Sequence, residues 1–89
     1  MVSFSITYTK KAVKDIKNLK SAHLDTKAKA LVHILRENPY QTPPPYKRLV
    51  GDLEGIDSRR INIQHRLVYQ VREADQTVAI LSMWSHYEF

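Results

Sequence analysis

Arginine and histidine side chains gather in one stretch of the chain, and they are the groups that cleavage of a phosphodiester would need. Arg59, Arg60, His65 and Arg66 lie close together, and His86 follows near the C-terminus. Arginine presents a rigid fork of donors that suits phosphate, and histidine titrates near neutral pH. The pattern indicates either a nuclease or a surface that grips nucleic acid.

Size and charge set the first limits on what this chain does. Its 89 residues predict one small domain, residues 1–89, without room for a second core. The formal net charge of +5, from 14 basic and 9 acidic residues, favours an anionic partner such as nucleic acid or an acidic peptide. Basic charge is also common in domains that bind no polyanion.

The composition excludes several kinds of site. The absence of cysteine excludes disulfides and thiol nucleophiles, and only two glycines rule out a Walker-type phosphate loop. No pattern of metal ligands is present, so we expect no metal and no cofactor. The chain lacks an apolar signal core and a run long enough to span a membrane, so we expect a cytoplasmic protein without a membrane partner.

The elements that must position the basic residues follow from periodicity. Residues 3–8 alternate as in a strand, and Thr9 is a plausible N-cap for a helix that ends near Lys20. A second helix begins near Asp25, its expected cap, and stops at Asn38-Pro39. The strands expected after it are Tyr46–Val50, Ser58–Ile63, Arg66–Arg72 and Thr77–Trp84.

This order, β-α-α-β-β-β with room for one more strand, predicts an α+β fold with both helices on one face of a small, mainly antiparallel sheet. The other face is then free for basic residues on alternate strand positions. Arg60 and Arg66 would meet across neighbouring antiparallel strands, and His86 could close the same surface. The aromatic residues available to stack on RNA bases are Tyr46, Trp84 and Tyr87.

Structural roles for the same residues stay open from the pattern alone. Trp84 and Tyr69 are more often core residues than base platforms. His65 lies in an expected turn and can simply cap it. Arg66 and His86 are about as consistent with structural ion pairs as with catalysis.

Three segments carry a resemblance to a known family: Leu53-x-Gly55-x-x-Ser58-Arg59-Arg60-Ile61, His65-Arg66-Leu67-Val68-Tyr69 and the ending His86-Tyr87. They closely resemble the Txe/YoeB family of bacterial type II toxins, within the RelE/ParE superfamily. The resemblance implies a RelE-like microbial ribonuclease fold. It also implies a protein that enters the ribosomal A site and cuts messenger RNA there. It implies an acidic, YefM-like antitoxin as partner, and operator DNA only as part of the antitoxin complex. A homodimer is a further possibility.

Site roles follow from the same resemblance, residue by residue. Arg66 matches the arginine that stabilises charge on the scissile phosphate, His86 the acid that protonates the departing 5′ oxygen, and Tyr87 the tyrosine beside it. Arg60 matches a basic residue of the groove, and we expect Lys47 and Arg48 to bind RNA beside it. The implied reaction is metal-independent: the ribose 2′-OH attacks the adjacent phosphate and leaves a 2′,3′-cyclic phosphate and a 5′-OH.

The general base is where the chain departs from the family. Members typically carry a glutamate two residues before the leucine that matches Leu49, and Lys47 stands there. A lysine serves as a base only if its pKa is strongly lowered. Glu54 is a candidate substitute. The alternatives are a weakened or non-catalytic toxin relative, or a ParE-like inhibitor of a protein target such as DNA gyrase, although the ending His86-Tyr87 argues against the gyrase version.

Overall fold

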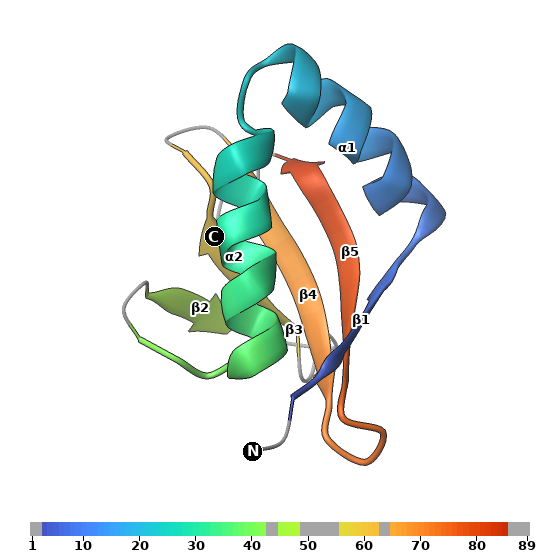
Figure 1. Cartoon of the computed structure of the whole chain (residues 1–89), viewed down its shortest axis with the longest axis vertical. Helices are drawn as coiled ribbons and strands as arrows, with labels where there is room; N and C mark the ends of the chain where they lie inside the picture. Colours follow the sequence, from blue (N-terminus) through green and yellow to red (C-terminus); the bar gives the residue numbers. More distant parts are fainter. Residues whose placement is uncertain (1–2, 43–44, 49–55, 63–64, 86–89) are drawn as a thin grey trace.

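The protein folds as two helices and a five-stranded sheet (Figure 1). The computed structural model describes residues 3–42, 45–48, 56–62 and 65–85, and only the backbone of Ser85. The elements are β1 (Ser5–Tyr8), α1 (Lys10–Ser21), α2 (Asp25–Glu37), β2 (Tyr46–Arg48), β3 (Ile56–Arg60), β4 (Arg66–Arg72) and β5 (Thr77–Ser85). The strand order is β1-β5-β4-β3-β2, with β1 parallel to β5 and the other pairs antiparallel. The predicted α+β fold and its optional fifth strand are confirmed.

The two helices begin differently. Thr9 caps α1 as predicted, since its side-chain oxygen accepts a hydrogen bond from the Ala12 amide at 3.1 Å. The predicted cap of α2 is wrong: the N-cap is Leu24, which makes no side-chain cap bond, and Asp25 is the first helical residue. There its carboxylate faces the positive end of the helix dipole.

The core lies between the helices and one face of the sheet. Apolar residues at helical spacing in α1 and α2 meet alternate residues of the strands, because the two periods bring one side of each element inward. The buried residues of this core are Ala12, Leu19, Ala28, Leu31, Val32, Leu35, Ile61, Leu67, Tyr69, Val78, Ile80 and Met83.

Strand register divides the neighbouring residues of β2, β3 and β4 between two faces. We call the face that meets the core the helix face; it carries Tyr46, Arg48, Asp57, Arg59, Leu67 and Tyr69. The far face carries Lys47, Ser58, Arg60, Arg66 and Val68. Arg60 and Arg66 are direct partners across β3 and β4, so the predicted cross-strand pair is confirmed.

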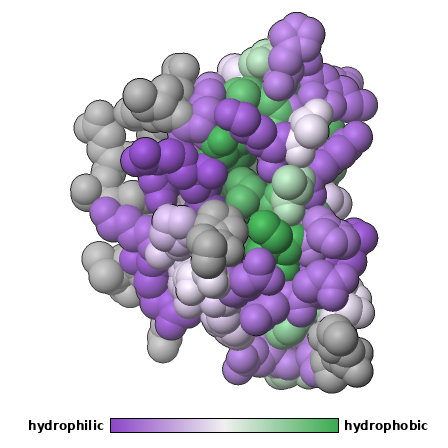
Figure 2. All heavy atoms as spheres, turned by 60° about the vertical axis from the view of Figure 1, so that its left-hand side comes forward, coloured by the Kyte–Doolittle hydropathy of each residue, from purple (hydrophilic) through white to green (hydrophobic). Residues whose placement is uncertain are grey.

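The outer surface is largely polar. In the view of Figure 2 the described side chains are mostly hydrophilic, and apolar ones form a narrow strip between them. Within the described ranges, neither helix is long and apolar enough to cross a membrane.

Candidate functional site

Three basic residues from adjacent strands share the far face: Lys47 in β2, Arg60 in β3 and Arg66 in β4. Together with Pro45 and Tyr46 they line a pocket of about 320 Å³. Antiparallel pairing fixes this arrangement, since directly opposed residues project to the same side of a sheet. The fold therefore collects positive charge from three strands around one concavity.

A side chain of the neighbouring strand β3 holds Arg66 in place. Its Nε donates a hydrogen bond to Ser58 Oγ at 3.1 Å, and Ser58 is fully buried. Burial lowers the pKa of Arg66, and the positive charge of Arg60 lowers it further. An anion placed between the two guanidinium groups would relieve their repulsion and accept charge-assisted hydrogen bonds.

Arg59, next to Arg60 in sequence, has a different environment on the helix face. It is fully buried; its Nε donates to the Tyr69 hydroxyl at 3.1 Å and its Nη2 to the Pro39 carbonyl at 2.9 Å. Its guanidinium carbon lies 4.9 Å from the centroid of the Tyr46 ring. These contacts give Arg59 a structural role in the interior.

Arg48 is not brought together with the far-face arginines. It lies opposite Asp57, and its Nε and Nη2 donate to the two carboxylate oxygens of Asp57 at 2.9 and 3.4 Å. These bonds raise the pKa of Arg48. Of the basic residues expected to bind RNA, Lys47 and Arg60 share the face of Arg66, whereas Arg48 is part of a structural ion pair on the helix face.

The aromatic residues expected to stack on bases are engaged within the protein where they are described. The ring of Trp84 is stacked on His65, with centroids 3.8 Å apart and planes 17° apart, and Tyr46 lies against Arg59. His65 is 6 % exposed, and its amide donates to Asn62 Oδ1 at 2.6 Å. His65 therefore holds the start of β4, in agreement with its expected structural role.

The other expected site residues, His86, Tyr87 and Glu54, lie outside the described residues. Ser58 is the site residue that the sequence analysis did not assign, and its signal is the alternation that puts it on the same side of β3 as Arg60. In the described part of the chain, no three histidine, aspartate or glutamate side chains are grouped to hold a metal ion.

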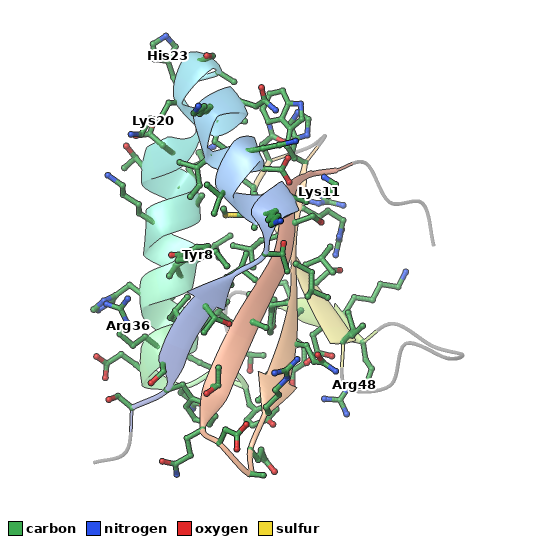
Figure 3. The ribbon with its side chains drawn as sticks, turned by 90° about the vertical axis from the view of Figure 1, so that its right-hand side faces the viewer. Tyr8, Lys11, Lys20, His23, Arg36 and Arg48 are labelled. Atoms are coloured by element: carbon green, nitrogen blue, oxygen red, sulfur yellow. The ribbon has the colours of Figure 1, made fainter. Side chains whose placement is uncertain are left out.

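A second pocket, of about 340 Å³, lies between the helices and is separate from the far-face site. Its apolar floor is bordered by basic side chains, and Figure 3 shows Tyr8, Lys20 and Arg36 on one side of the molecule with Arg48 on the other. It contains none of the far-face cations Lys47, Arg60 and Arg66.

Comparison of the chain with solved structures finds the same fold in bacterial toxins. The chain is 26% identical to the YoeB/ParE toxin from Agrobacterium tumefaciens, with a TM-score of 0.84 over 94% of this chain and 100% of that one. It is 30% identical to a chain of the YoeB-YefM complex from Staphylococcus aureus, with a TM-score of 0.77 over 94% and 98%. The Escherichia coli DinJ-YafQ complex, at 22% identity, 96% and 94% coverage and a TM-score of 0.81, shares the fold.

Family assignment comes from the sequence itself. A search of curated proteins finds no match. The family model of the YoeB-like toxin of bacterial type II toxin-antitoxin systems matches residues 8–87, which is nearly the whole chain. The chain therefore belongs to the YoeB-like toxins of bacterial type II toxin–antitoxin systems.

Proposed function

We propose that this toxin is a ribosome-dependent endoribonuclease that cuts messenger RNA in the A site of the cytoplasmic ribosome and so inhibits translation. The observation that carries the proposal is the pair of Arg60 and Arg66, directly opposed on the far face and lining one pocket with Lys47. Two guanidinium groups on one side of a sheet suit the non-bridging oxygens of a phosphodiester.

The reaction we propose is attack of the ribose 2′-OH on the adjacent phosphate. A bond forms between the 2′ oxygen and phosphorus, and the bond to the 5′ oxygen breaks, which yields a 2′,3′-cyclic phosphate and a 5′-OH. Arg66, anchored on Ser58, stabilises the charge that grows on the phosphoryl oxygens. From the family resemblance, His86 gives a proton to the leaving oxygen and Tyr87 assists it.

The base that takes the 2′ proton is the open part of this mechanism. Lys47 stands at the place of the family glutamate and lines the pocket together with Arg60 and Arg66. Glu54 is the alternative within the chain. The nearby cations also weaken the demand for a strong base, since they stabilise a deprotonated 2′ oxygen.

Mapping of transcript ends in a translating lysate tests the proposal. The wild-type protein should create new 5′ ends within translated messages, each with a free 5′-OH, and Arg66→Ala should lose most of them. Identical 5′ ends from the wild type and from Arg66→Ala would show that this site does not carry the cleavage.

One departure from the family favours a second candidate, a weakened nuclease. The variant Lys47→Glu places a carboxylate at the pocket. It distinguishes a fully active nuclease from a weakened one. A sharp rise in cleavage would mean that the natural protein is an attenuated enzyme, and an unchanged rate would place the base elsewhere.

The partners we propose are the ribosome with its message and an acidic, YefM-like antitoxin. The Staphylococcus aureus relatives support the antitoxin, since they include a YoeB-YefM complex and a YoeB-YefM heterotetramer. A YoeB dimer from the same organism supports a homodimer. Binding of operator DNA would belong to the complex with the antitoxin.

A further inference from the structure

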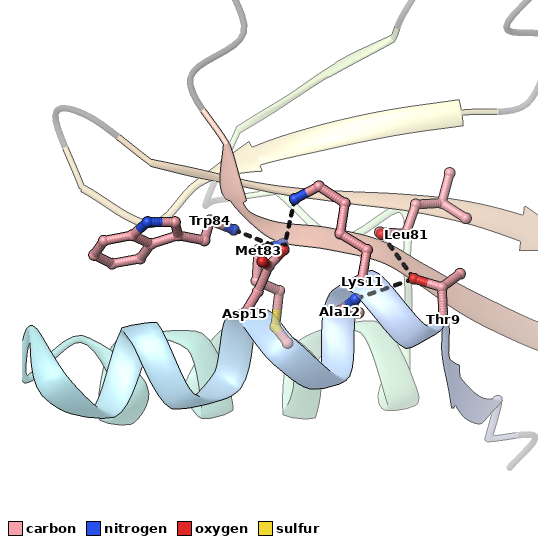
Figure 4. A network of polar contacts seen from close by, with 7 residues as sticks. All are labelled: Thr9, Lys11, Ala12, Asp15, Leu81, Met83 and Trp84. Carbon is pink, nitrogen blue, oxygen red and sulfur yellow. Dashed lines mark hydrogen bonds and ion pairs between the residues drawn. The ribbon is translucent and has the colours of Figure 1, made fainter.

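Asp15 is an acidic residue that the family motif leaves without a role. It lies in the middle of α1, is 4 % exposed, and points towards β5 (Figure 4). One oxygen, Oδ2, accepts hydrogen bonds from the amides of Met83 at 3.0 Å and Trp84 at 3.2 Å, and from Lys11 Nζ at 3.0 Å. A buried carboxylate is costly unless donors of this kind surround it.

These bonds lie along the edge of β5, just beyond the point where its pairing with β1 ends. The last pair between β1 and β5 is Tyr8 with Ile80. Beyond it, the Thr9 amide donates to the Ile80 carbonyl at 3.1 Å and Thr9 Oγ1 to the Leu81 carbonyl at 2.8 Å. Asp15 then binds the next amides of the same strand. Helix α1 therefore satisfies backbone groups of β5 that a longer β1 would otherwise pair.

The bonds to Asp15 fall where β5 is irregular. Between the pairs Val68–Ser82 and Arg66–Ser85, β4 advances by two residues and β5 by three. Consecutive amides of a regular strand point to opposite edges, yet the amides of Met83 and Trp84 meet the same carboxylate oxygen. The extra residue is a β-bulge, and the carboxylate is the group that binds its two amides.

The bulge decides what stands next to the phosphate-binding arginine. With the neighbouring register shift between Val68 and Tyr69, it places Ser85 opposite Arg66, and the Trp84 ring is stacked on His65, the residue just before Arg66. A slip by one residue would turn every following side chain of β5 to the other face. In sequence the residue after Ser85 is His86, to which we assign the acid.

We propose that Asp15 is a positioning residue for RNA cleavage: from helix α1 it holds the β5 bulge that sets the end of β5 opposite Arg66. The inference rests on the proposed function, because it assigns a remote support to the same site. It concerns the rate of the chemical step and not the binding of the message, since Asp15 lies on α1, away from the far-face pocket.

Steady-state cleavage on ribosomes programmed with a defined message tests this role. Asp15→Asn keeps the shape and one acceptor but loses the charge, and we expect kcat to fall about 3- to 10-fold because neutral hydrogen bonds are weaker. Asp15→Ala should lower kcat at least 10-fold, with KM within twofold of the wild type. Lys11→Gln is the matched control: it removes the ion pair, leaves both amide bonds, and should keep kcat within twofold.

Amide hydrogen exchange supplies a readout that is independent of catalysis. In Asp15→Ala the amides of Met83 and Trp84 should exchange at least 10-fold faster than in the wild type, while amides in the middle of β4 keep their protection. Asp15→Asn decides the outcome if Asp15→Ala does not fold. Rates are expressed per folded molecule, so a general loss of structure is not counted as loss of positioning.

The outcomes separate the two proposals. A wild-type protein that never cuts ribosome-bound message contradicts the proposed function itself. If the wild type cuts and both Asp15 variants retain its kcat per folded molecule, the positioning role is wrong while the proposed function stands. An equal loss in Lys11→Gln would also overturn it, since that variant leaves the amide bonds intact.

Discussion

Arg59 and Arg60 are neighbours in the sequence, yet they have opposite environments in the fold. Arg59 lies on the helix face, fully buried, bonded to Tyr69 and Pro39. Arg60 lies on the far face, exposed, opposite the second arginine, Arg66. Because successive side chains of a strand point to opposite faces, the charge of Arg59 lies in the interior and that of Arg60 faces a pocket.

The difference teaches how to recognise a functional arginine in a basic protein. On the helix face the guanidinium of Arg59 contacts an aromatic ring, a hydroxyl and a carbonyl. On the far face the guanidinium of Arg60 lies opposite that of Arg66. Two like charges so placed are unfavourable until an anion binds between them. The buried arginine is satisfied by groups of the protein itself, whereas the far-face pair would gain from a bound anion.

Removal of Arg59 should have the largest effect on stability. In Arg59→Ala the Tyr69 hydroxyl and the Pro39 carbonyl lose a charged donor in the interior, and we expect a loss of about 3–5 kcal/mol in the free energy of unfolding. Urea denaturation measures it. Arg60→Ala is the matched control and should change stability by less than about 0.5 kcal/mol; equal losses in the two variants would remove the contrast between the faces.

Alkaline pH should have the next largest effect on stability, through ionisation of Tyr69 on the helix face. Burial raises the pKa of Tyr69 from 10.0 to about 12, although Arg59 opposes this. Between these values the unfolded chain loses the phenol proton and the folded chain keeps it, so stability is full below pH 10 and falls as pH rises to about 12. We expect a loss of roughly 3 kcal/mol from this group. Tyr69→Phe should lack that part of the pH dependence in parallel denaturation curves.

Arg60→Ala should mainly weaken the electrostatic grip on RNA. We expect cleavage at low message concentration to fall about 10-fold, with kcat changed less than KM. The slope of log Kd against log salt for a short single-stranded RNA should become shallower by about 0.7, since one phosphate contact is lost. A slope equal to that of the wild type would mean that Arg60 does not contact phosphate.

Arg48→Ala should have the smallest effect on cleavage. Because Arg48 binds Asp57 on the helix face, we expect its loss to leave the cleavage rate per folded molecule within twofold. The melting temperature should fall, but by less than in Arg59→Ala. A tenfold loss of cleavage at unchanged stability would return Arg48 to the RNA-binding surface.

Periodicity predicted most of the fold and the central pair of the site. Alternation in segments 58–63 and 66–72 was sufficient to oppose Arg60 and Arg66, because the side-chain period of a strand leaves only two faces. The cap at Thr9 followed from residue type alone. Strand ends were less certain: β3 begins at Ile56 and ends at Arg60, earlier than the expected Ser58–Ile63.

Long-range partners could not be predicted in the same way. That Arg48 binds Asp57 depends on the register of β2, which is set by pairing and not by local pattern. The bond from Asp15 to the end of β5 joins residues far apart in sequence through an irregular strand. No periodic signal marks a bulge, so this support for the site is visible only in three dimensions.

The cleavage rate of Arg66→Ala, measured beside Arg59→Met and divided by the folded fraction of each, tests the central claim most directly. The far-face account predicts that Arg66→Ala stays folded and loses about 100- to 1000-fold in rate, as expected for removal of a group that stabilises transition-state charge. Arg59→Met should lose stability yet cut at nearly the wild-type rate per folded molecule. A fully active Arg66→Ala, or a folded but inactive Arg59→Met, would contradict the account.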